Sequence, residues 1–427
     1  MMHIVIIGNG IAGITAARHI RKLSDHRITV ISGEADYFFS RPALMYVYMG
    51  HMKWEHIEPY ERWFWKKNRI ELRKAWVEKI DFPNKELHFA DGQSMSYDKL
   101  LIATGSKPNK FGWPGQDLDG VHGFYSLQDL KAIEYHSKNL QQAVIVGGGL
   151  IGLELAEMLR SRDIPVTFLV REKSYWDMVL PPEESQMVNR HIREHHIDLR
   201  LETELKEIWG DQNGKAKMVI TSTGEKIPCG LVGLTAGVHP NIEFLHFSGL
   251  ELDRGILTDE YLRTNIEDVY AAGDCVQLKN PPPGRRPIEA VWYVGRMMGE
   301  TVAHTLCGNP KRYEPGIWFN SAKFLDIEYQ VYGQLTADIP PEHDTLYWEH
   351  PAKHQSLRIA YDKNSQAVKG FLAMGLRLRH EQCDAWIRQE TPLQTVLQNL
   401  QDANFDPEFF ADWTAALKEE LQGATAS

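Results

Sequence analysis

Two glycine-rich segments have the residue types and spacing to hold the pyrophosphate of a dinucleotide. Each follows a short apolar run and precedes an amphipathic stretch, as a strand, a turn and a helix would require. The glycines of the two GxGxxG patterns are Gly8, Gly10 and Gly13 in the first and Gly147, Gly149 and Gly152 in the second. In such a turn the first glycine permits a tight bend, the second lets the backbone approach the phosphates, and the third lets helix and strand pack closely. The free N–H groups at the helix start then face the negative charge.

A second pair of segments repeats at nearly the same spacing. Residues 101–109 and 232–241 share Gly, Pro and Asn at an offset of 132 residues, and the two GxGxxG patterns are 139 residues apart. Two copies of a nucleotide-binding domain explain both offsets, because chance would have to supply two motif pairs in the same order. The strands that we expect in the two βαβ units are 4–7, 28–31, 143–146 and 166–170.

The composition is that of a multidomain globular protein. The chain has 427 residues, a formal net charge of −10 and 43% hydrophobic residues. This length suggests about two to four domains. The acidic balance argues against a nucleic-acid-binding protein, because such a protein would need a basic face.

The cysteines and the apolar runs bear on location. Four cysteines stand far apart, at positions 229, 275, 307 and 383. With no CxxC pair and no metal-ligand spacing we expect no bound metal, and the scattered thiols favour a cytoplasmic protein. The first strand-like run begins at His3, which leaves no room for a charged leader. The longest apolar run, residues 143–153, is shorter than the roughly 20 residues of a membrane helix, so no membrane span is expected.

Together the motifs resemble those of a known family. Residues 103–105 (Ala-Thr-Gly) and 270–274 (Tyr-Ala-Ala-Gly-Asp) resemble two further motifs of flavoproteins that carry two dinucleotide-binding domains and are related to the pyridine-nucleotide–disulfide reductases. The resemblance covers residues 1–335 well and is greatest for the branch of rubredoxin and ferredoxin reductases and the flavin module of assimilatory nitrite reductases. It implies FAD at the first glycine turn, NADH or NADPH at the second, and hydride transfer from nicotinamide C4 to flavin N5.

We therefore expect an α/β fold with two Rossmann-like dinucleotide-binding domains and a smaller α+β C-terminal domain. From about Gly316 the sequence changes to aromatic-rich strands and turns, and a helical tail follows. The resemblance implies that this third domain borders the flavin edge or forms a homodimer. The expected boundaries are 1–112 and 242–315 for a discontinuous FAD-binding domain, 113–241 for the NAD(P)H-binding domain and 316–427 for the C-terminal domain.

Several residues outside the first glycine turn are assigned to FAD. The resemblance implies that Asp274 hydrogen-bonds the ribityl chain or the pyrophosphate, and that Arg41 pairs with a phosphate or the adenine. It also implies that Trp292, in a helix start at 288–292, borders the flavin ring. The plainer alternatives are a turn aspartate, a solvated arginine and a packing tryptophan. Glu34 follows the second strand and is the candidate acid for the ribose. The predicted FAD set is Gly8, Gly10, Ile11, Ala12, Gly13, Glu34, Arg41, Pro42, Ala103, Thr104, Gly105, Gly273, Asp274, Glu289, Ala290 and Trp292.

The second glycine turn is assigned to NADH or NADPH. The resemblance places Glu154 near the nicotinamide, where it would orient the carboxamide; the alternative is a carboxylate that stabilises a helix start. Arg171 beside Glu172 leaves NADH and NADPH both open, because an arginine favours a 2′-phosphate and an acid favours a 2′-hydroxyl. The predicted NAD(P)H set is Gly147, Gly149, Leu150, Ile151, Gly152, Glu154, Arg171 and Gly237. Glu154 and Trp292 are also the candidate catalytic residues, with the flavin itself as the redox centre.

The chain departs from the family pattern in two ways. Residues 35–60 hold no cysteine, which excludes a disulfide reductase and an oxidase that uses a cysteine sulfenate in that segment. Cys275 is accordingly expected to be a small buried hydrophobe. Tyr46 stands where rubredoxin-type relatives often carry a lysine near flavin N5, so a cation close to the flavin is missing.

Three functions from different classes are open. The favoured one is an FAD-dependent NAD(P)H oxidoreductase that passes electrons to a separate acceptor, either a ferredoxin- or rubredoxin-like protein or a quinone. The others are an NAD(P)H oxidase that uses O2 and an NADH-responsive flavoprotein with a binding or signalling role. An acidic carrier protein would need a basic patch, for which Arg285, Arg286 and 377–380 are the obvious candidates. A small neutral acceptor such as a quinone is therefore credible.

Overall fold

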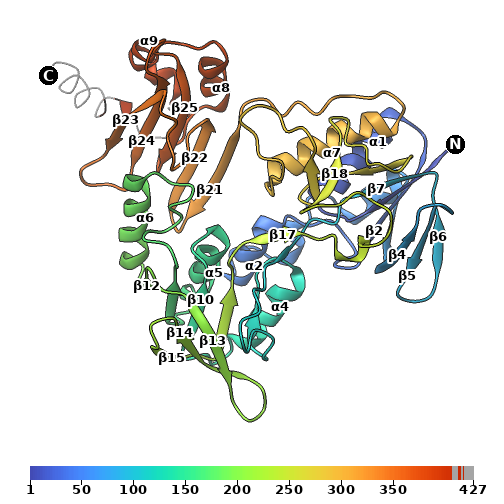
Figure 1. The fold of residues 1–427 in the computed structure, drawn as a ribbon, viewed down its shortest axis with the longest axis horizontal. Coiled ribbons are helices and arrows are strands. Elements are labelled where there is room, and N and C mark those ends of the chain that lie inside the picture. The colour runs from blue at the N-terminus through green and yellow to red at the C-terminus, as the bar shows by residue number, and fades with distance from the viewer. Residues whose placement is uncertain (406–411, 415–416, 418–427) are drawn as a thin grey trace. The chain divides into compact units, whose positions relative to one another are not determined.

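Figure 1 shows the computed structural model of the chain, which describes residues 1–405, 412–414 and 417. The chain forms two compact units. The first unit combines residues 1–112, 120–139 and 234–315, and the second combines 113–119, 140–233 and 316–427. The first glycine turn therefore lies in the first unit and the second glycine turn in the second.

A five-stranded parallel sheet is the centre of the first unit. Its strands are β1 (His3–Ile7), β2 (Arg27–Ser32), β3 (Ile70–Lys74), β7 (Lys99–Ile102) and β19 (Val269–Ala271). They lie in the order β19-β7-β1-β2-β3, and each neighbouring pair is parallel. The apolar run in β1 is buried, as is typical of a parallel strand covered on both faces. The expected strands 4–7 and 28–31 are thus confirmed.

Two helices of the first unit, α1 (Ile11–Leu23) and α7 (Trp292–Leu306), pack closely against each other. The contact needs glycine, because a Cβ at Gly299 would lie 2.4 Å from the backbone oxygen of Ala12. The start of α7 lies next to the start of α1, since a Cβ at Gly295 would lie 3.2 Å from Cγ2 of Ile11. These helix starts, at the carboxyl edge of the sheet, are what position the candidate site.

Smaller elements complete the first unit. Its short helices are η1 (Arg41–Ala43), α2 (Leu44–Tyr48), η2 (Trp54–Ile57), α3 (Arg62–Lys67), α4 (Leu127–His136) and η3 (Glu243–Leu245). Its other strands are β4 (Val77–Asp81), β5 (Glu86–Phe89), β6 (Ser94–Ser96), β8 (Ser106–Pro108), β9 (Val121–His122), β17 (Val238–Pro240), β18 (Ile256–Thr258) and β20 (Val276–Leu278). β4, β5 and β6 form an antiparallel sheet, and β8 pairs with β17.

The second unit contains a second Rossmann-like sheet. Its strands are β10 (Ala143–Val146), β11 (Val166–Leu169), β12 (Asp198–Arg200) and β16 (Leu231–Leu234), in the order β12-β11-β10-β16. Helix α5 (Leu150–Arg160) follows β10, and α6 (Pro182–Glu194) precedes β12. An antiparallel sheet of β13 (Leu205–Gly210), β14 (Ala216–Thr221) and β15 (Lys226–Pro228) is added to them. The expected strands 143–146 and 166–170 are confirmed to within one residue.

The C-terminal part of the second unit is an antiparallel sheet with helices. Its strands are β21 (Phe319–Phe324), β22 (Ile327–Gly333), β23 (His343–Glu349), β24 (Ser356–Asp362) and β25 (Val368–Met374), in the order β21-β22-β25-β24-β23. Its helices are α8 (His380–Arg388), α9 (Leu393–Gln398) and η4 (Leu400–Ala403). Trp348, Phe371 and Trp386 share its core. The predicted fold class is confirmed, and most of the predicted helical tail beyond residue 405 lies outside the described residues.

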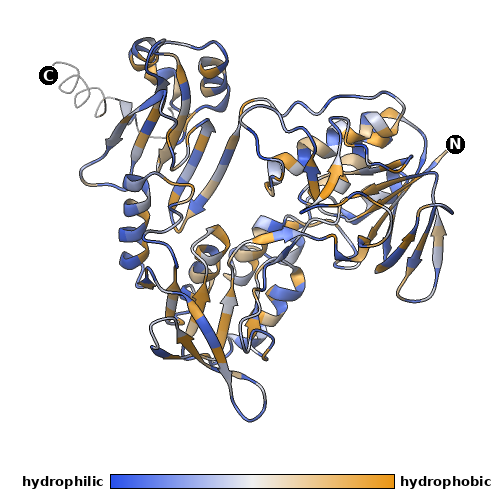
Figure 2. Cartoon of the chain, viewed as in Figure 1, coloured by the Kyte–Doolittle hydropathy of each residue, from blue (hydrophilic) through white to orange (hydrophobic). Residues whose placement is uncertain are grey.

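Hydropathy follows this architecture. The strands of the two parallel sheets are mainly hydrophobic, whereas α6 is mostly polar (Figure 2). Among the helices that the structure describes, none combines the length and the apolar character that crossing a bilayer would require.

A buried ion pair joins α6 to the C-terminal sheet within the second unit. Arg358 on β24 donates to Glu184 on α6 with a distance of 2.9 Å from Nε to Oε1, and the Glu184 side chain is fully buried. Burial raises the pKa of the Glu184 carboxyl, and Arg358 opposes that shift. A second pair, Arg190–Glu349, bridges the same elements but is half-exposed.

Removing one partner of the buried pair should destabilise the second unit strongly. We expect Arg358→Met to cost about 3–5 kcal/mol, because it leaves the Glu184 carboxylate buried and unpaired. The double variant Arg358→Met/Glu184→Leu should recover most of that loss. Arg190→Met, which breaks the exposed pair, should cost less than about 1 kcal/mol. Urea unfolding of the four proteins measures these differences, and equal losses in the two arginine variants would contradict the expectation.

Candidate functional site

The first glycine turn has two tight positions and one open position. Gly8 has a φ of +111°, and a Cβ there would lie 2.0 Å from the backbone oxygen of Ala103. A Cβ at Gly13 would lie 2.0 Å from the oxygen of Gly8. At Gly10, in contrast, a Cβ would meet nothing within 4 Å. Two glycines therefore close the turn, and the third leaves open space beside the backbone.

The starts of α1 and α7 carry no acidic side chain and no side-chain cap. The N-cap of α1 is Gly10, which has no side chain to cap the helix, and the first turn of α1 holds no acidic residue. The N-cap of α7 is Val291, and its first turn also holds no acidic residue. The free N–H groups and positive ends of two helices thus meet at one edge of the sheet. Ile11 and Ala12, both in the predicted FAD set, form the first residues of α1.

The Gly-Asp turn after β19 lies at the same edge. Gly273 has a φ of +84°, and the next residue, Asp274, accepts hydrogen bonds at Oδ2 from Ser106 Oγ and Tyr125 OH, both at 3.3 Å. Burial raises the pKa of the Asp274 carboxyl, while the charge of Arg41 acts in the opposite direction. Asp274 is therefore a half-buried acceptor whose present partners are two hydroxyl groups, the same chemistry that a ribityl chain offers.

Arg41 and Glu34, both predicted to contact FAD, bind each other. The two guanidinium nitrogens of Arg41 donate to the two carboxylate oxygens of Glu34 at 2.9 and 2.6 Å. Glu34 also accepts from the backbone N–H of Leu127 at the start of α4. Arg41 further donates to the backbone oxygen of Tyr125 at 2.6 Å. Pro42 is the second residue of the short helix η1 that begins at Arg41.

Tyr125 is the site residue that sequence reasoning missed. Its hydroxyl accepts from the backbone N–H of Ser106 at 3.1 Å and donates to Asp274, and its ring lies 4.5 Å from the Arg41 guanidinium. A local signal did exist, because Ser126 and Asp129 form a capping box that fixes Tyr125 immediately before α4. That signal gives the place of the residue but not its distant partners.

The Ala-Thr-Gly turn packs directly against the first glycine turn. The backbone oxygen of Ala103 is the atom that Gly8 approaches. Thr104 donates from Oγ1 to the backbone oxygen of Asn241 at 2.8 Å, and Gly105 has a φ of +69°. These residues therefore lie with the first glycine turn, in the first unit.

Gly237, predicted to contact NAD(P)H, also lies in the first unit. Its backbone oxygen accepts from the N–H of Asn109 at 3.0 Å, and it leads into β17, which pairs with β8. The two repeated segments recognised in the sequence thus pair with each other. The other predicted NAD(P)H residues lie in the second unit.

The segment before α7 differs from the expected helix start. The helix begins at Trp292, not at 288, because Glu289 is held outside it by a buried ion pair. Arg285 donates to Glu289 at 2.6 and 2.9 Å, and the two side chains are 4% and 6% exposed. Ala290 follows in the same non-helical segment, and Trp292 is half-buried with its ring 5.5 Å from that of Tyr293.

The second glycine turn repeats the local geometry of the first. Gly147 has a φ of +117°, a Cβ at Gly149 would meet nothing within 4 Å, and Gly152 is buried in the first turn of α5. Helix α5 begins with Leu150 and Ile151, has Gly149 as its N-cap and carries no acidic residue in its first turn. This is therefore a second uncapped helix start, of the kind that favours an anion.

Glu154 lies one turn into α5 and is half-buried. Burial raises the pKa of its carboxyl to about 7, with the charge of Glu157 adding to the shift. Glu154 thus changes protonation state near neutral pH, unlike an ordinary surface glutamate. Arg171 is exposed and donates to its own neighbour Glu172 at 2.9 Å, which leaves the choice between NADH and NADPH as open as the sequence left it.

The four cysteines are free thiols. Burial raises the pKa of Cys229 to about 12 and that of Cys275 to about 11. Cys275 is fully buried, which confirms it as a small apolar residue beside the Gly-Asp turn. High thiol pKa values disfavour the reactive thiolate form, so Cys229 and Cys275 are poorly suited to thiol redox chemistry.

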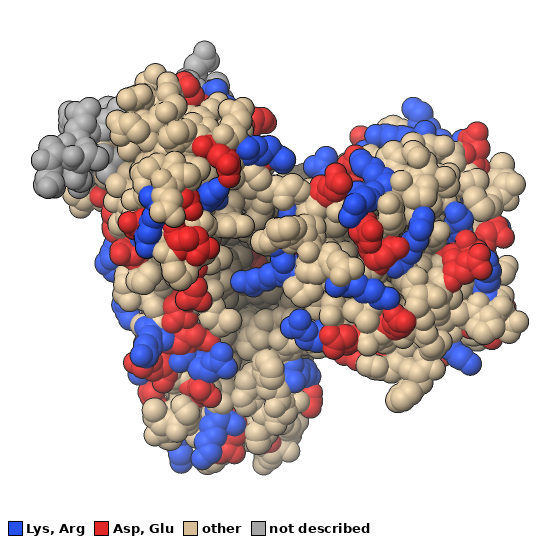
Figure 3. All heavy atoms as spheres, turned by 45° about the horizontal axis from the view of Figure 1, so that its top comes forward, with Lys and Arg blue, Asp and Glu red and all other residues tan. Residues whose placement is uncertain are grey.

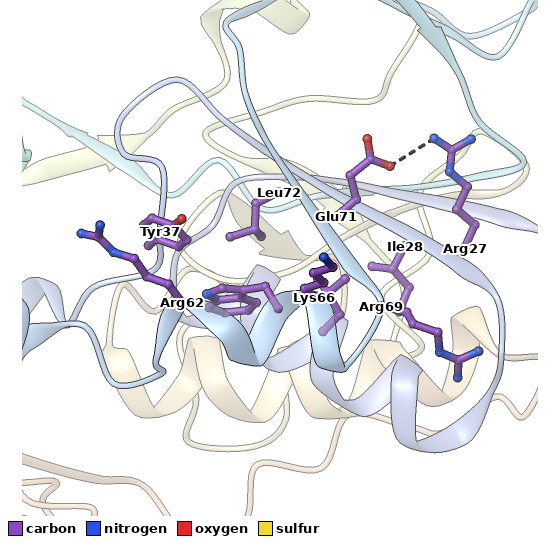
Figure 4. A pocket seen from close by; sticks show the side chains of 10 residues that line it. Arg27, Ile28, Tyr37, Arg62, Lys66, Arg69, Glu71 and Leu72 are labelled. Atoms are coloured by element: carbon purple, nitrogen blue, oxygen red, sulfur yellow. Dashed lines mark hydrogen bonds and ion pairs between the residues drawn. The ribbon is translucent and has the colours of Figure 1, made fainter.

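A separate pocket of about 480 Å³ lies beside α3 (Figure 4). Arg27 and Glu71 form an ion pair on its wall at 3.1 Å. The pocket residues are Arg27, Ile28, Tyr37, Arg62, Trp65, Lys66, Arg69, Ile70, Glu71 and Leu72. None of them belongs to the predicted FAD or NAD(P)H sets, so this pocket is distinct from the glycine turn.

Two of the basic residues proposed for docking an acidic carrier are paired with carboxylates. Arg285 is bound to Glu289, and Arg377 forms an ion pair with Glu328. On the face shown in Figure 3, Lys and Arg side chains are interspersed with Asp and Glu side chains. Charge alone therefore does not identify a docking surface on that face.

Comparison with known proteins agrees with the predicted family. Residues 2–299 match the family described as pyridine nucleotide-disulphide oxidoreductase. A ferredoxin–NAD(P)(+) reductase of Sphingomonas sp is 32% identical over 375 residues, which cover 86% of this chain and 88% of that one. A rubredoxin–NAD(+) reductase of Acinetobacter baylyi is 31% identical over 286 residues, or 65% of this chain and 73% of that one. The assimilatory nitrate reductase electron transfer subunit of Bacillus subtilis is 26% identical over 84% of this chain, which spans only 46% of its length.

Solved structures share the fold. The ferredoxin reductase for a cytochrome P450 system of Rhodopseudomonas palustris has a TM-score of 0.80 at 22% identity, covering 98% of this chain and 100% of that one. A NAD-dependent persulfide reductase of A. fulgidus has a TM-score of 0.85 at 24% identity, covering 100% and 84%. With the family match spanning both glycine turns, the chain belongs to the pyridine nucleotide-disulphide oxidoreductase family and is an FAD-dependent NAD(P)H oxidoreductase.

Proposed function

We propose that the protein takes hydride from NADH or NADPH onto FAD and passes the electrons to a separate carrier, a ferredoxin- or rubredoxin-like protein or a quinone. The observation that carries this proposal is the presence of two open, uncapped glycine turns in one chain, at residues 8–13 and 147–152. Relatives named as ferredoxin and rubredoxin reductases support the acceptor class.

The first turn would hold FAD. The N–H groups at the start of α1 would bind its pyrophosphate beside Gly10, and Asp274 would exchange its present hydroxyl partners for those of the ribityl chain. The start of α7 would favour negative charge on the reduced ring, with Trp292 beside it. Arg41 and Glu34 would lie toward the phosphate and ribose end. When bound, FAD supplies hydride acceptance at N5 and release of electrons singly or in pairs.

The second turn would hold NAD(P)H. The start of α5 would bind the pyrophosphate beside Gly149, and Glu154 would orient the nicotinamide carboxamide. No side-chain nucleophile is needed, because holding the donor carbon at the acceptor ring lowers much of the barrier. Arg171 at the end of the sheet is the residue proposed to contact the ribose region.

We propose the domain roles on the same basis. The FAD-binding domain would comprise 1–112 and 242–315, the NAD(P)H-binding domain 113–241, and the C-terminal domain 316–427 would border the flavin edge or form a homodimer. Placement of 1–112 and 234–315 in one compact unit supports the discontinuous arrangement, but the same unit also contains 120–139 of the proposed NAD(P)H-binding domain. A cytoplasmic location is also proposed, with the four free cysteines as its support.

Anaerobic titration tests the proposed function directly. The purified yellow protein should lose its flavin absorbance on addition of NADH or NADPH and recover it rapidly with a ferredoxin, a rubredoxin or a quinone, but slowly with air. Rapid recovery in air without any carrier would instead identify an NAD(P)H oxidase. A long-lived complex with NADH that none of these acceptors reoxidises would contradict both enzymatic functions.

A matched pair of glycine variants should separate the two nucleotide sites. Gly10→Glu and Gly149→Glu both place a side chain in open space at a negative φ, so neither should impair folding. The added carboxylate repels a phosphate at the helix start. We expect Gly10→Glu to be purified without flavin, and Gly149→Glu to retain flavin but lose most of its reduction by NAD(P)H. Absorbance spectra and anaerobic reduction rates check this, and a yellow, NADH-reducible Gly10→Glu protein would show that the first site is misassigned.

Glu154 should give flavin reduction a pH dependence centred near pH 7. Its carboxyl, with a pKa of about 7, is protonated below that pH and ionised above it. Glu154→Gln resembles the protonated form, so its reduction rate should be independent of pH and equal to the low-pH limb of the unsubstituted protein. Glu154→Ala should slow reduction while FAD stays bound. Stopped-flow measurements check this. Glu157→Gln removes the charge that adds to the shift, so the midpoint of its pH profile should lie below that of the unsubstituted protein. Loss of flavin from Glu154→Ala would overturn the assigned role.

A further inference from the structure

A histidine cluster lies at the end of α6, away from both glycine turns. His191 and His195 are one helical turn apart, and the turn between β21 and β22 brings Asp326 to them. Nε2 of His191 is hydrogen-bonded to Oδ1 of Asp326, and Nε2 of His195 is 3.7 Å from the same oxygen. The three ligand atoms all lie within 4.8 Å of one another. A tetrahedral zinc ion with bonds of about 2.0–2.1 Å spaces its ligand atoms by about 3.3 Å, so small side-chain movements suffice.

The ring of His195 is oriented so that its Nε2 can bind a metal. Its Nδ1 lies 3.0 Å from the backbone oxygen of His191, and a carbonyl oxygen can only accept. Nδ1 therefore carries a proton, which leaves Nε2, 3.7 Å from Oδ1 of Asp326, as the nitrogen available to bind a metal. A hydrogen bond from the second ring nitrogen to a carbonyl is a common way of orienting a metal-binding histidine.

One ring nitrogen of His191 is buried beside a carboxylate. The His191 side chain is only 3% exposed, and its Nδ1 has no hydrogen bond. That nitrogen lies 3.5 Å from Oε2 of Glu194, which accepts a hydrogen bond from His354 at 2.8 Å. If Nε2 of His191 donates to Asp326, the bare Nδ1 faces a carboxylate, which is unfavourable. A cation on Nε2 would move the proton to Nδ1, where it could donate to Glu194.

We propose that His191, His195 and Asp326 bind a divalent transition-metal ion of the zinc class, with Glu194 orienting His191. Two imidazoles and one carboxylate are a donor set that suits Zn²⁺ and its neighbours. The fourth position faces water, since Asp326 is 75% exposed and His195 is half-exposed. The prediction of no bound metal was based on cysteine spacing alone and did not consider these histidines.

The metal would link α6 to the C-terminal sheet within the second unit. Two of its ligands come from α6, beside the second Rossmann-like sheet, and the third comes from the C-terminal sheet. The same two elements are already joined by the Arg358–Glu184 pair. A bound ion that is absent from the unfolded chain adds its binding free energy to folding, so the expected consequence is a more stable C-terminal sheet.

Zinc binding by the full-length, FAD-loaded protein tests the proposal. After treatment with a chelator and dialysis against ZnCl2, we expect about one zinc ion per chain by elemental analysis and a higher melting temperature. His195→Ala and Asp326→Asn change exposed ligands rather than the buried one, so they should fold normally but lose both effects. Glu194→Gln should retain the site with about 10–100-fold weaker binding. The control His246→Ala changes an exposed histidine of the first unit and should bind zinc normally.

Cobalt provides a second readout. Co²⁺ in a four-coordinate histidine and carboxylate site absorbs visible light at longer wavelength than oxidised flavin, so its spectrum can be read in the yellow protein. We expect that absorption in the unsubstituted protein and not in Asp326→Asn. No bound zinc, or equal zinc binding by the unsubstituted protein and Asp326→Asn, would overturn the proposal and leave the cluster as a set of hydrogen-bonded side chains.

Discussion

The first unit depends on three places where two stretches of backbone meet with no side chain between them. A Cβ at Gly8 would lie 2.0 Å from the oxygen of Ala103, one at Gly13 equally close to that of Gly8, and one at Gly299 2.4 Å from that of Ala12. These approaches hold β1 against the Ala-Thr-Gly turn and α1 against α7. Because the helices are in contact near their starts, their unpaired N–H groups and positive ends fall at the same edge of the sheet as the Gly-Asp turn. The affinity that we propose for a dinucleotide at that edge thus originates in missing side chains more than in present ones.

Local physics decided what could be predicted from the sequence. Buried parallel strands are short apolar runs, and a glycine turn must follow one and open a helix, so the strands, the presence of a helix at the first glycine turn and the fold class were all accessible. The side-chain contacts between residues far apart in the sequence could not be predicted in this way. Tyr125 contacts Asp274 across 149 positions, and Arg41 and Glu34, each predicted to contact FAD, also bind each other. Spacing locates a residue on its element, but the fold selects its partner.

Charged residues were the hardest to interpret. Glu184 and Arg358 are 174 positions apart, and in the sequence each looks like a solvated side chain. In the structure they are buried together, because an ion pair deep between two elements is tolerated when its hydrogen bonds are complete. Arg285 shows the same effect. In the sequence it was a candidate for a docking patch, but in the structure it forms an ion pair with the buried Glu289. Composition and charge counts therefore say little about which charges a partner protein would meet.

The two glycine turns are nearly identical in local geometry, yet the proposal gives them different tasks. A GxGxxG turn recognises only the pyrophosphate, which FAD and NAD(P)H share, so the difference must come from what surrounds each turn. The first is backed by the start of a second helix and by Asp274, whose hydrogen-bonding partners are hydroxyl groups. The second is backed by Val170 and by Glu154, which titrates near pH 7. More fixed polar groups around the first turn favour a resident cofactor, whereas a valine and a single titrating carboxyl at the second favour a nucleotide that binds, reacts and leaves.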